Sequence, residues 1–91
     1  MAAEGGNIVR FTYTGADGEI IPRDATHVFV DVTTIPARAF DRHRNIVEVI
    51  CHDRVEKIEE YAFRCCSSMK RLFMPGVKVV GSRAFSGCPA L

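Results

Sequence analysis

The sequence has no tryptophan and no long apolar run, and its positive charges barely outnumber its negative ones. A formal net charge of +1 over 91 residues gives no strong field to attract nucleic acid or an acidic membrane, so we expect neither as a partner. No segment is long and apolar enough to cross a bilayer, and the N-terminus lacks the basic and apolar parts of a signal peptide. A cytoplasmic location is therefore the default expectation.

Motifs for catalysis or for binding a cofactor are also missing. Gly5-Gly6 stands near the N-terminus and is not part of a phosphate-binding loop. The chain is long enough for one small core and too short for a second. Basic and acidic residues alternate along it, as is typical of a solvated surface of mixed charge. We expect no enzyme activity and no cofactor, so the function has to be inferred from the architecture.

What the sequence does contain is a repeat. The dipeptide Ala-Phe occurs at Ala39-Phe40, Ala62-Phe63 and Ala84-Phe85, in steps of 23 and 22 residues. A fixed period in the twenties is typical of solenoids, in which each repeat buries its apolar side against its neighbours. One repeat cannot offset the entropy of ordering its own chain, so the repeats must stack. The three phenylalanines should therefore share one core.

The residues before each Ala-Phe pair predict a turn. An aliphatic residue stands four positions before the alanine in every unit, at Ile35, Ile58 and Val80. This spacing places the aliphatic residue, the alanine and the phenylalanine on one side of a short helical turn. We expect that turn to lay its apolar side inward.

The residues after each turn predict a strand. In 46–51 and 69–74 the first, fourth and sixth positions are apolar, and the later part alternates as a half-buried strand does. The same register extends back to 28–30. Before the repeats, 8–14 and 19–21 are strand-like and flank an Asp17-Gly18 turn signal, which predicts a small β unit that caps the first repeat. Residues 1–27 are thus assigned to an N-terminal tail and β cap, and residues 28–91 to about two and a half repeats.

The run from Ile58 to Pro75 reads Ile-x-x-x-Ala-Phe-x-x-Cys-x-x-Met-x-x-Leu-x-Met-Pro. It resembles the BspA-like class of leucine-rich repeats, and the resemblance extends over residues 28–91. The first unit departs from the pattern, because His43 stands in the cysteine column and His52 in the proline column. The resemblance implies an α/β fold: a short leucine-rich-repeat solenoid of parallel strands and short helical turns with an N-terminal β cap. It also implies a non-catalytic protein-protein interaction module with a protein partner.

The binding face of such a solenoid is expected on the outward strand positions, which stack into a continuous surface. Ile50 beside Phe73 predicts a hydrophobic spot on this face, which is either exposed or covered by the leading β unit. Glu48 beside Arg71 is better explained as an ion pair between strands. The candidate binding residues are Val47, Glu48, Ile50, His52, Lys70, Arg71 and Phe73.

Cysteine and histidine suggest two other kinds of site. Cys51-His52 and Cys65-Cys66 are adjacent pairs without the spacing of a zinc knuckle, and neighbours on a strand point to opposite faces. A nucleophile pair of His43 with Cys65 or Cys66 would face the core, where there is no cleft for a substrate. We expect no metal and no catalytic site. Cys66 and its column mate Cys88, like Cys51, should be reduced and buried, and Cys65 should point outward.

The last repeat stops at Leu91, where another strand should begin. The sequence leaves three explanations open: a fragment of a longer array, a premature gene product, or a chain whose open edge pairs with a partner. The first is the most economical. We expect marginal stability and self-association through the uncapped last repeat. Two alternatives to the interaction module remain: a structural fragment without independent activity, and a thiol- or metal-binding protein.

Overall fold

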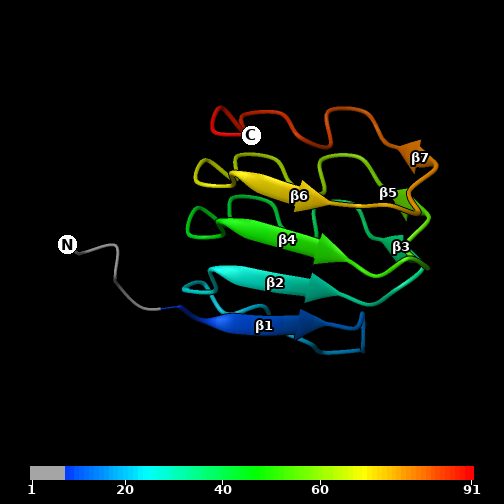
Figure 1. Cartoon of the computed structure of the whole chain (residues 1–91), viewed down its shortest axis with the longest axis horizontal. Helices are drawn as coiled ribbons and strands as arrows, with labels where there is room; N and C mark the ends of the chain where they lie inside the picture. Colours follow the sequence, from blue (N-terminus) through cyan, green and yellow to red (C-terminus); the bar gives the residue numbers. More distant parts are fainter. Residues whose placement is uncertain (1–7) are drawn as a thin grey trace.

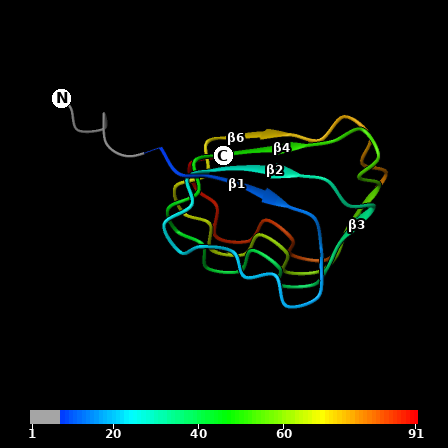
Figure 2. The ribbon, with the colours of Figure 1, turned by 90° about the horizontal axis from the view of Figure 1, so that it is seen from below.

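The computed structural model describes residues 8–91, so the tail expected at residues 1–7 lies outside the described residues. The chain winds into coils that stack on one another in sequence order (Figure 1). Figure 2 looks along this stack. The longer strands form one side of every coil, and irregular turns form the opposite side. The protein is a small β-solenoid, as the repeat predicts.

Two parallel sheets run along the stack. The four-stranded sheet has the order β1 (Arg10–Tyr13), β2 (His27–Val30), β4 (Glu48–Cys51) and β6 (Arg71–Phe73). The three-stranded sheet consists of β3 (Thr34–Ile35), β5 (Lys57–Ile58) and β7 (Val79–Val80). Strands adjacent in either sheet come from successive coils, and all of the pairs are parallel.

The register between coils is the one that the repeat predicts. Glu48 pairs with Arg71 and Ile50 with Phe73 across β4 and β6. Because side chains alternate along a strand, this register places like residues above one another on both faces of the sheet. The inward positions of β4 are buried, and those of β6 are half-buried.

Aromatic rings form a ladder through the core. Phe40 stacks on Phe63 with the ring centroids 4.9 Å apart, and Phe63 stacks on Phe85 at 5.4 Å. The prediction that these three side chains share one core is confirmed. Tyr13 extends the ladder by one ring, because its edge meets Phe40 at a centroid distance of 5.1 Å. The sequence did not predict this fourth member.

The helical turns that made the expected class α/β are not confirmed, because residues 8–91 contain no helix. The backbone takes left-handed φ angles at corresponding positions of successive coils, 62° at Arg38 and 58° at Tyr61, and a helix cannot continue through them. Alternate N–H groups therefore bond to the next coil instead of along a helix. Phe40 N donates to Ala62 O at 2.7 Å, whereas Ala39 N donates back to Pro36 O.

The N-terminal unit is built differently from expectation. Of its two strand-like stretches only the first forms a strand, β1, which lies parallel to β2 at one end of the stack. Residues 19–21 form no strand. Instead, the Glu19 carboxylate accepts hydrogen bonds from the backbone N–H groups of Thr14 and Gly15 and closes the loop between them. Ile20 is left 82% exposed on this loop.

Membrane insertion by a helix finds no support in the described part of the chain. Among residues 8–91, no helix has the length and the apolar character that spanning a bilayer requires.

Candidate functional site

The outward face of the four-stranded sheet carries one column of large apolar side chains. Phe29, Ile50 and Phe73 are paired in register across β2, β4 and β6, and they are 38%, 39% and 52% exposed. We call these three side chains the apolar column. Thr12 on β1 continues the row with a polar residue. Large apolar side chains side by side on a solvent face are unusual and mark surfaces that meet other molecules.

Phe29 was not among the predicted binding residues. The repeat register did assign Val28–Val30 to a strand slot, and the same alternation that exposes Ile50 exposes Phe29. The signal was therefore present in the sequence.

Two shallow hollows lie on this face, and Phe29 and Ile50 contribute to both. The first hollow lies toward β1 and includes polar side chains from the row that precedes the apolar column, those of Arg10, His27 and Glu48. The second lies toward the ends of the strands and is lined mainly by apolar groups, with Phe73 and Pro75 among them. The apolar column thus forms the ridge between a polar hollow and an apolar one.

Ion pairs flank the apolar column on both sides. Arg71 Nε donates to Glu48 Oε1 at 2.7 Å on one side, as the sequence predicted. On the other side Arg54 Nε donates to Asp31 Oδ1, also at 2.7 Å. Both pairs are largely exposed and add little to stability. Their effect is to neutralise one carboxylate in each flank.

The remaining predicted binding residues differ in exposure and in how much they contribute to the outward face. His52 is exposed, and its ring meets Phe29 edge-on at a centroid distance of 6.4 Å. Lys70 is exposed immediately before β6, with no carboxylate partner among residues 8–91. Val47 is half-buried, and its backbone carbonyl oxygen accepts a hydrogen bond of 2.8 Å from the N–H group of Lys70. Val47 therefore contributes least to the face.

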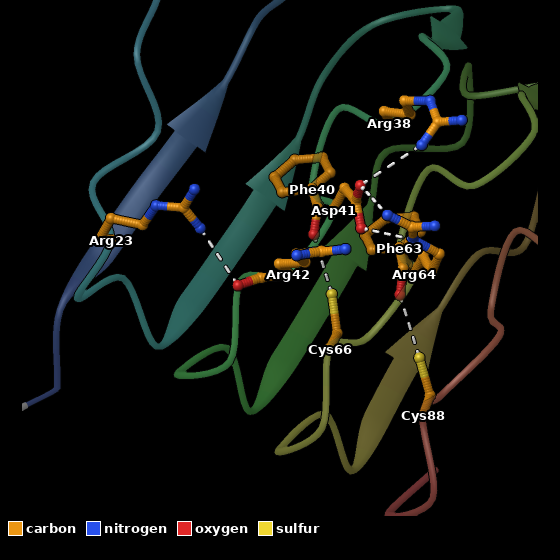
Figure 3. Close-up of polar contacts among 9 residues, drawn as sticks. All are labelled: Arg23, Arg38, Phe40, Asp41, Arg42, Phe63, Arg64, Cys66 and Cys88. Atoms are coloured by element: carbon orange, nitrogen blue, oxygen red, sulfur yellow. Dashed lines mark hydrogen bonds and ion pairs between the residues drawn. The ribbon is translucent and has the colours of Figure 1, made fainter.

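Charged side chains also join the turns on the opposite side of the coils (Figure 3). Arg64 makes two hydrogen bonds of 3.0 Å to the carboxylate of Asp41 in the preceding coil, and Arg38 approaches the same carboxylate at 3.8 Å. The hydrogen bond from Arg64 holds the pKa of Asp41 below its usual value. Both guanidinium groups lie over the ring of Tyr61, at 4.6 Å for Arg38 and 5.4 Å for Arg64.

Cysteine thiols form a second link between coils, also drawn in Figure 3. Cys66 Sγ donates to the carbonyl oxygen of Phe40, and Cys88 Sγ donates to that of Phe63, both at 3.1 Å. All four cysteines are free thiols. Cys51 and Cys66 are buried as expected, whereas Cys88, which was also expected to be buried, is only half-buried. Burial raises the pKa of Cys51 to about 11 and that of Cys66 to about 12.

His43 occupies the cysteine column of the first repeat without the cysteine hydrogen bond. It is 7% exposed, and its buried Nδ1 has no hydrogen-bond partner within residues 8–91. Burial, followed by the positive charge of Arg23, lowers the pKa of His43. Among residues 8–91 no group of three or more His, Cys, Asp or Glu side chains is arranged to hold a metal ion.

Comparisons with known proteins complete this picture. A family model described as "BspA type Leucine rich repeat region (6 copies)" matches residues 26–91. Comparison with curated proteins and with solved structures finds no significant match. The match covers well over half of the chain and includes every strand from β2 to β7, whereas β1 lies outside it. The chain therefore belongs to the BspA-type leucine-rich repeat family.

Proposed function

We propose that the chain is a non-catalytic module that binds another protein through the outward face of its four-stranded sheet. One observation carries the proposal: Phe29, Ile50 and Phe73 form a row of exposed apolar side chains on three adjacent strands. Repeat proteins use such continuous stacked surfaces to bind partners. Exposed aromatic side chains of this kind supply much of the free energy in protein interfaces.

Support for the non-catalytic part comes from the thiols and the histidine that could have formed a nucleophile pair. Cys66 and His43 are both buried in the core. The Cys66 thiol donates to a carbonyl oxygen, and its pKa is raised to about 12, so the thiolate needed for attack is scarce at neutral pH.

A pull-down from cells of the source organism tests the proposal. The protein is immobilised as wild type, as the double variant Ile50→Ser/Phe73→Ser, and as Val79→Ser, and captured proteins are quantified by mass spectrometry. Val79 is the matched control, because it is an outward residue of the other sheet and is 50% exposed. We expect the double variant alone to lose captured partners. If it retains every partner that the wild type and the control retain, the proposal fails.

A further inference from the structure

The size of the apolar column limits what it can bind. Neighbouring strands lie about 4.8 Å apart, so the three side chains of the column span about 10 Å. Because β2 and β4 have a strand on each side, their backbone groups are already bonded, and the face offers only side chains. In an extended segment, alternate side chains lie about 7 Å apart on one face. The column therefore accommodates two of them.

The charges beside the apolar column are not balanced. In the row that precedes it, Glu48 is neutralised by Arg71, whereas Arg10 is exposed with no carboxylate partner among residues 8–91. Lys70, which immediately precedes Arg71 at the start of β6, is exposed and also has no carboxylate partner among residues 8–91. This flank thus carries two uncompensated positive charges, one at each end of the column.

The opposite flank has the reverse character. Asp31 is paired with Arg54, and Asp53 lines the apolar hollow with no basic partner among residues 8–91. A ligand that lies along the column, from β2 to β6, therefore has a positive edge along one of its sides and a weakly negative edge along the other. Such a difference steers and orients a charged partner.

From this complementarity we propose that the face binds an extended peptide segment that carries two large apolar side chains, with acidic residues on one side of them. The apolar side chains lie on Phe29, Ile50 and Phe73, and the carboxylates meet Arg10 and Lys70. The inference rests on the proposed function and adds the chemistry of the partner. A segment flanked by basic residues is disfavoured, because it would place like charges together.

Three sets of synthetic fluorescent peptides test this chemistry. All share the core Leu-Ser-Phe and are flanked on one side by Asp-Glu, by Ser-Ser or by Lys-Lys. Binding to the full 91-residue chain is followed by fluorescence anisotropy at low and at high salt. We expect the acidic set to bind about tenfold more tightly than the basic set at low salt. The difference should shrink at high salt, because these charges are exposed.

Two charge-reversal variants test whether Arg10 and Lys70, and not the net charge of the protein, cause the preference for acidic peptides. Arg10→Glu/Lys70→Glu should invert the order of the acidic and basic sets. Lys57→Glu/Lys78→Glu makes the same change in net charge at exposed residues outside the four-stranded sheet, and it should leave the order unchanged. Ile50→Ser/Phe73→Ser should weaken binding of all three sets. Circular dichroism confirms that each variant is folded.

The outcomes distinguish this inference from the proposed function. If the three sets bind equally, if none binds, or if the acidic preference survives reversal of Arg10 and Lys70, the inference is overturned while the pull-down still decides the function. If peptides bind unchanged to the Ile50→Ser/Phe73→Ser variant, the surface itself is wrong and both proposals fall. A second copy of the chain could instead occupy the apolar column with its exposed Ile20. In that case the protein would self-associate, the variant Ile20→Ser would not, and the inference would be overturned.

Discussion

The ring of Phe40 lies almost parallel to that of Phe63, with 2° between the planes and 4.9 Å between the centroids. This separation is close to the spacing of neighbouring strands, about 4.8 Å. The rings therefore stack because the coils that carry them do. Both rings are fully buried, so their burial and stacking stabilise the fold.

Substitution of a phenylalanine in the ladder should lower the free energy of unfolding in proportion to the number of rings on which it stacks. Phe63→Leu removes the stacking on both Phe40 and Phe85 and should lower the free energy of unfolding by about 2–3 kcal/mol. Phe85→Leu removes one stacking contact from a half-buried ring and should cost about 1 kcal/mol. Phe73→Leu, at an exposed position, is the control and should cost less than about 0.5 kcal/mol. Urea unfolding measures all three, and equal losses would contradict a shared ladder.

Thiol reactivity should follow burial. Because the pKa of Cys51 is about 11 and that of Cys66 about 12, each holds at least about a hundredfold less thiolate than an ordinary cysteine at pH 8. Iodoacetamide should leave both unmodified in the folded protein, and half-exposed Cys65 should react first. Peptide mapping by mass spectrometry gives the order. In concentrated guanidinium chloride all four should react alike, and early labelling of Cys66 in the folded protein would be inconsistent with this packing.

His43 should make stability depend on pH. Its pKa is lowered in the folded state by burial and by Arg23, although Asp41 opposes the shift. As the pH falls below about 6.5, the unfolded chain gains a proton that the folded chain does not, so stability is full above this pH and declines below it.

The variant His43→Met replaces the imidazole with an apolar side chain that adapts to gaps. It should flatten this part of the pH profile in urea titrations. A wild-type stability that does not change between about pH 7 and pH 5 would show that His43 is not buried in this way.

The link between Asp41 and Arg64 should contribute more than the other ion pairs. Asp41→Asn weakens two charge-assisted hydrogen bonds at a carboxylate that is 16% exposed, and it should cost about 1–2 kcal/mol. Asp31→Asn breaks a pair whose side chains are 39% and 57% exposed and should cost less than about 1 kcal/mol. Because the pKa of Asp41 is lowered, its contribution is present above about pH 3.8 and is lost on further acidification. Similar losses from both variants would refute the distinction.

Gly76 should not tolerate a side chain. A Cβ atom there would lie 1.9 Å from the carbonyl oxygen of Asp53, within the backbone of the preceding coil. Gly76→Ala should therefore cost about 3 kcal/mol or more. Gly18→Ala separates this clash from backbone strain. Its φ of +78° is left-handed, but within residues 8–91 no atom beyond its two chain neighbours lies within 4 Å of the added Cβ, so the substitution should cost only about 1–2 kcal/mol. Thermal melts compare the two, and equal costs would argue against the close approach at Gly76.

The sequence predicted the features that depend on the spacing of side chains. The steps between Ala-Phe pairs predicted the phenylalanine ladder, and alternation along the strands predicted that Ile50 lies beside Phe73. Both follow from the repeat, because residues one period apart occupy equivalent places in successive coils. The same logic placed Cys66 in the core.

Backbone conformation was less accessible. The helical turn was inferred from side-chain spacing alone. Glycine is the usual sequence signal for a left-handed φ angle, and neither Arg38 nor Tyr61, which adopt such angles, is a glycine. Tyr13 was missed because its strand is not followed by an Ala-Phe pair. The Asp41–Arg64 link was concealed in a mixture of charges, since only the three-dimensional register of the turns shows which charges meet.

The hydrogen bonds from each turn to the next have a further consequence for how such an array grows. The turn that carries Phe63 offers a carbonyl oxygen to the turn before it, in the bond from Phe40 N to Ala62 O, and donates an N–H group to the turn after it, in the bond from Phe63 N to Ala84 O. Duplication of a segment such as residues 46–68 would therefore insert a whole coil whose two surfaces already match its new neighbours. The insertion would lengthen the solenoid by about 4.8 Å and would add one more isoleucine to the exposed apolar row, so a gene can enlarge this apolar face by copying one short stretch of DNA.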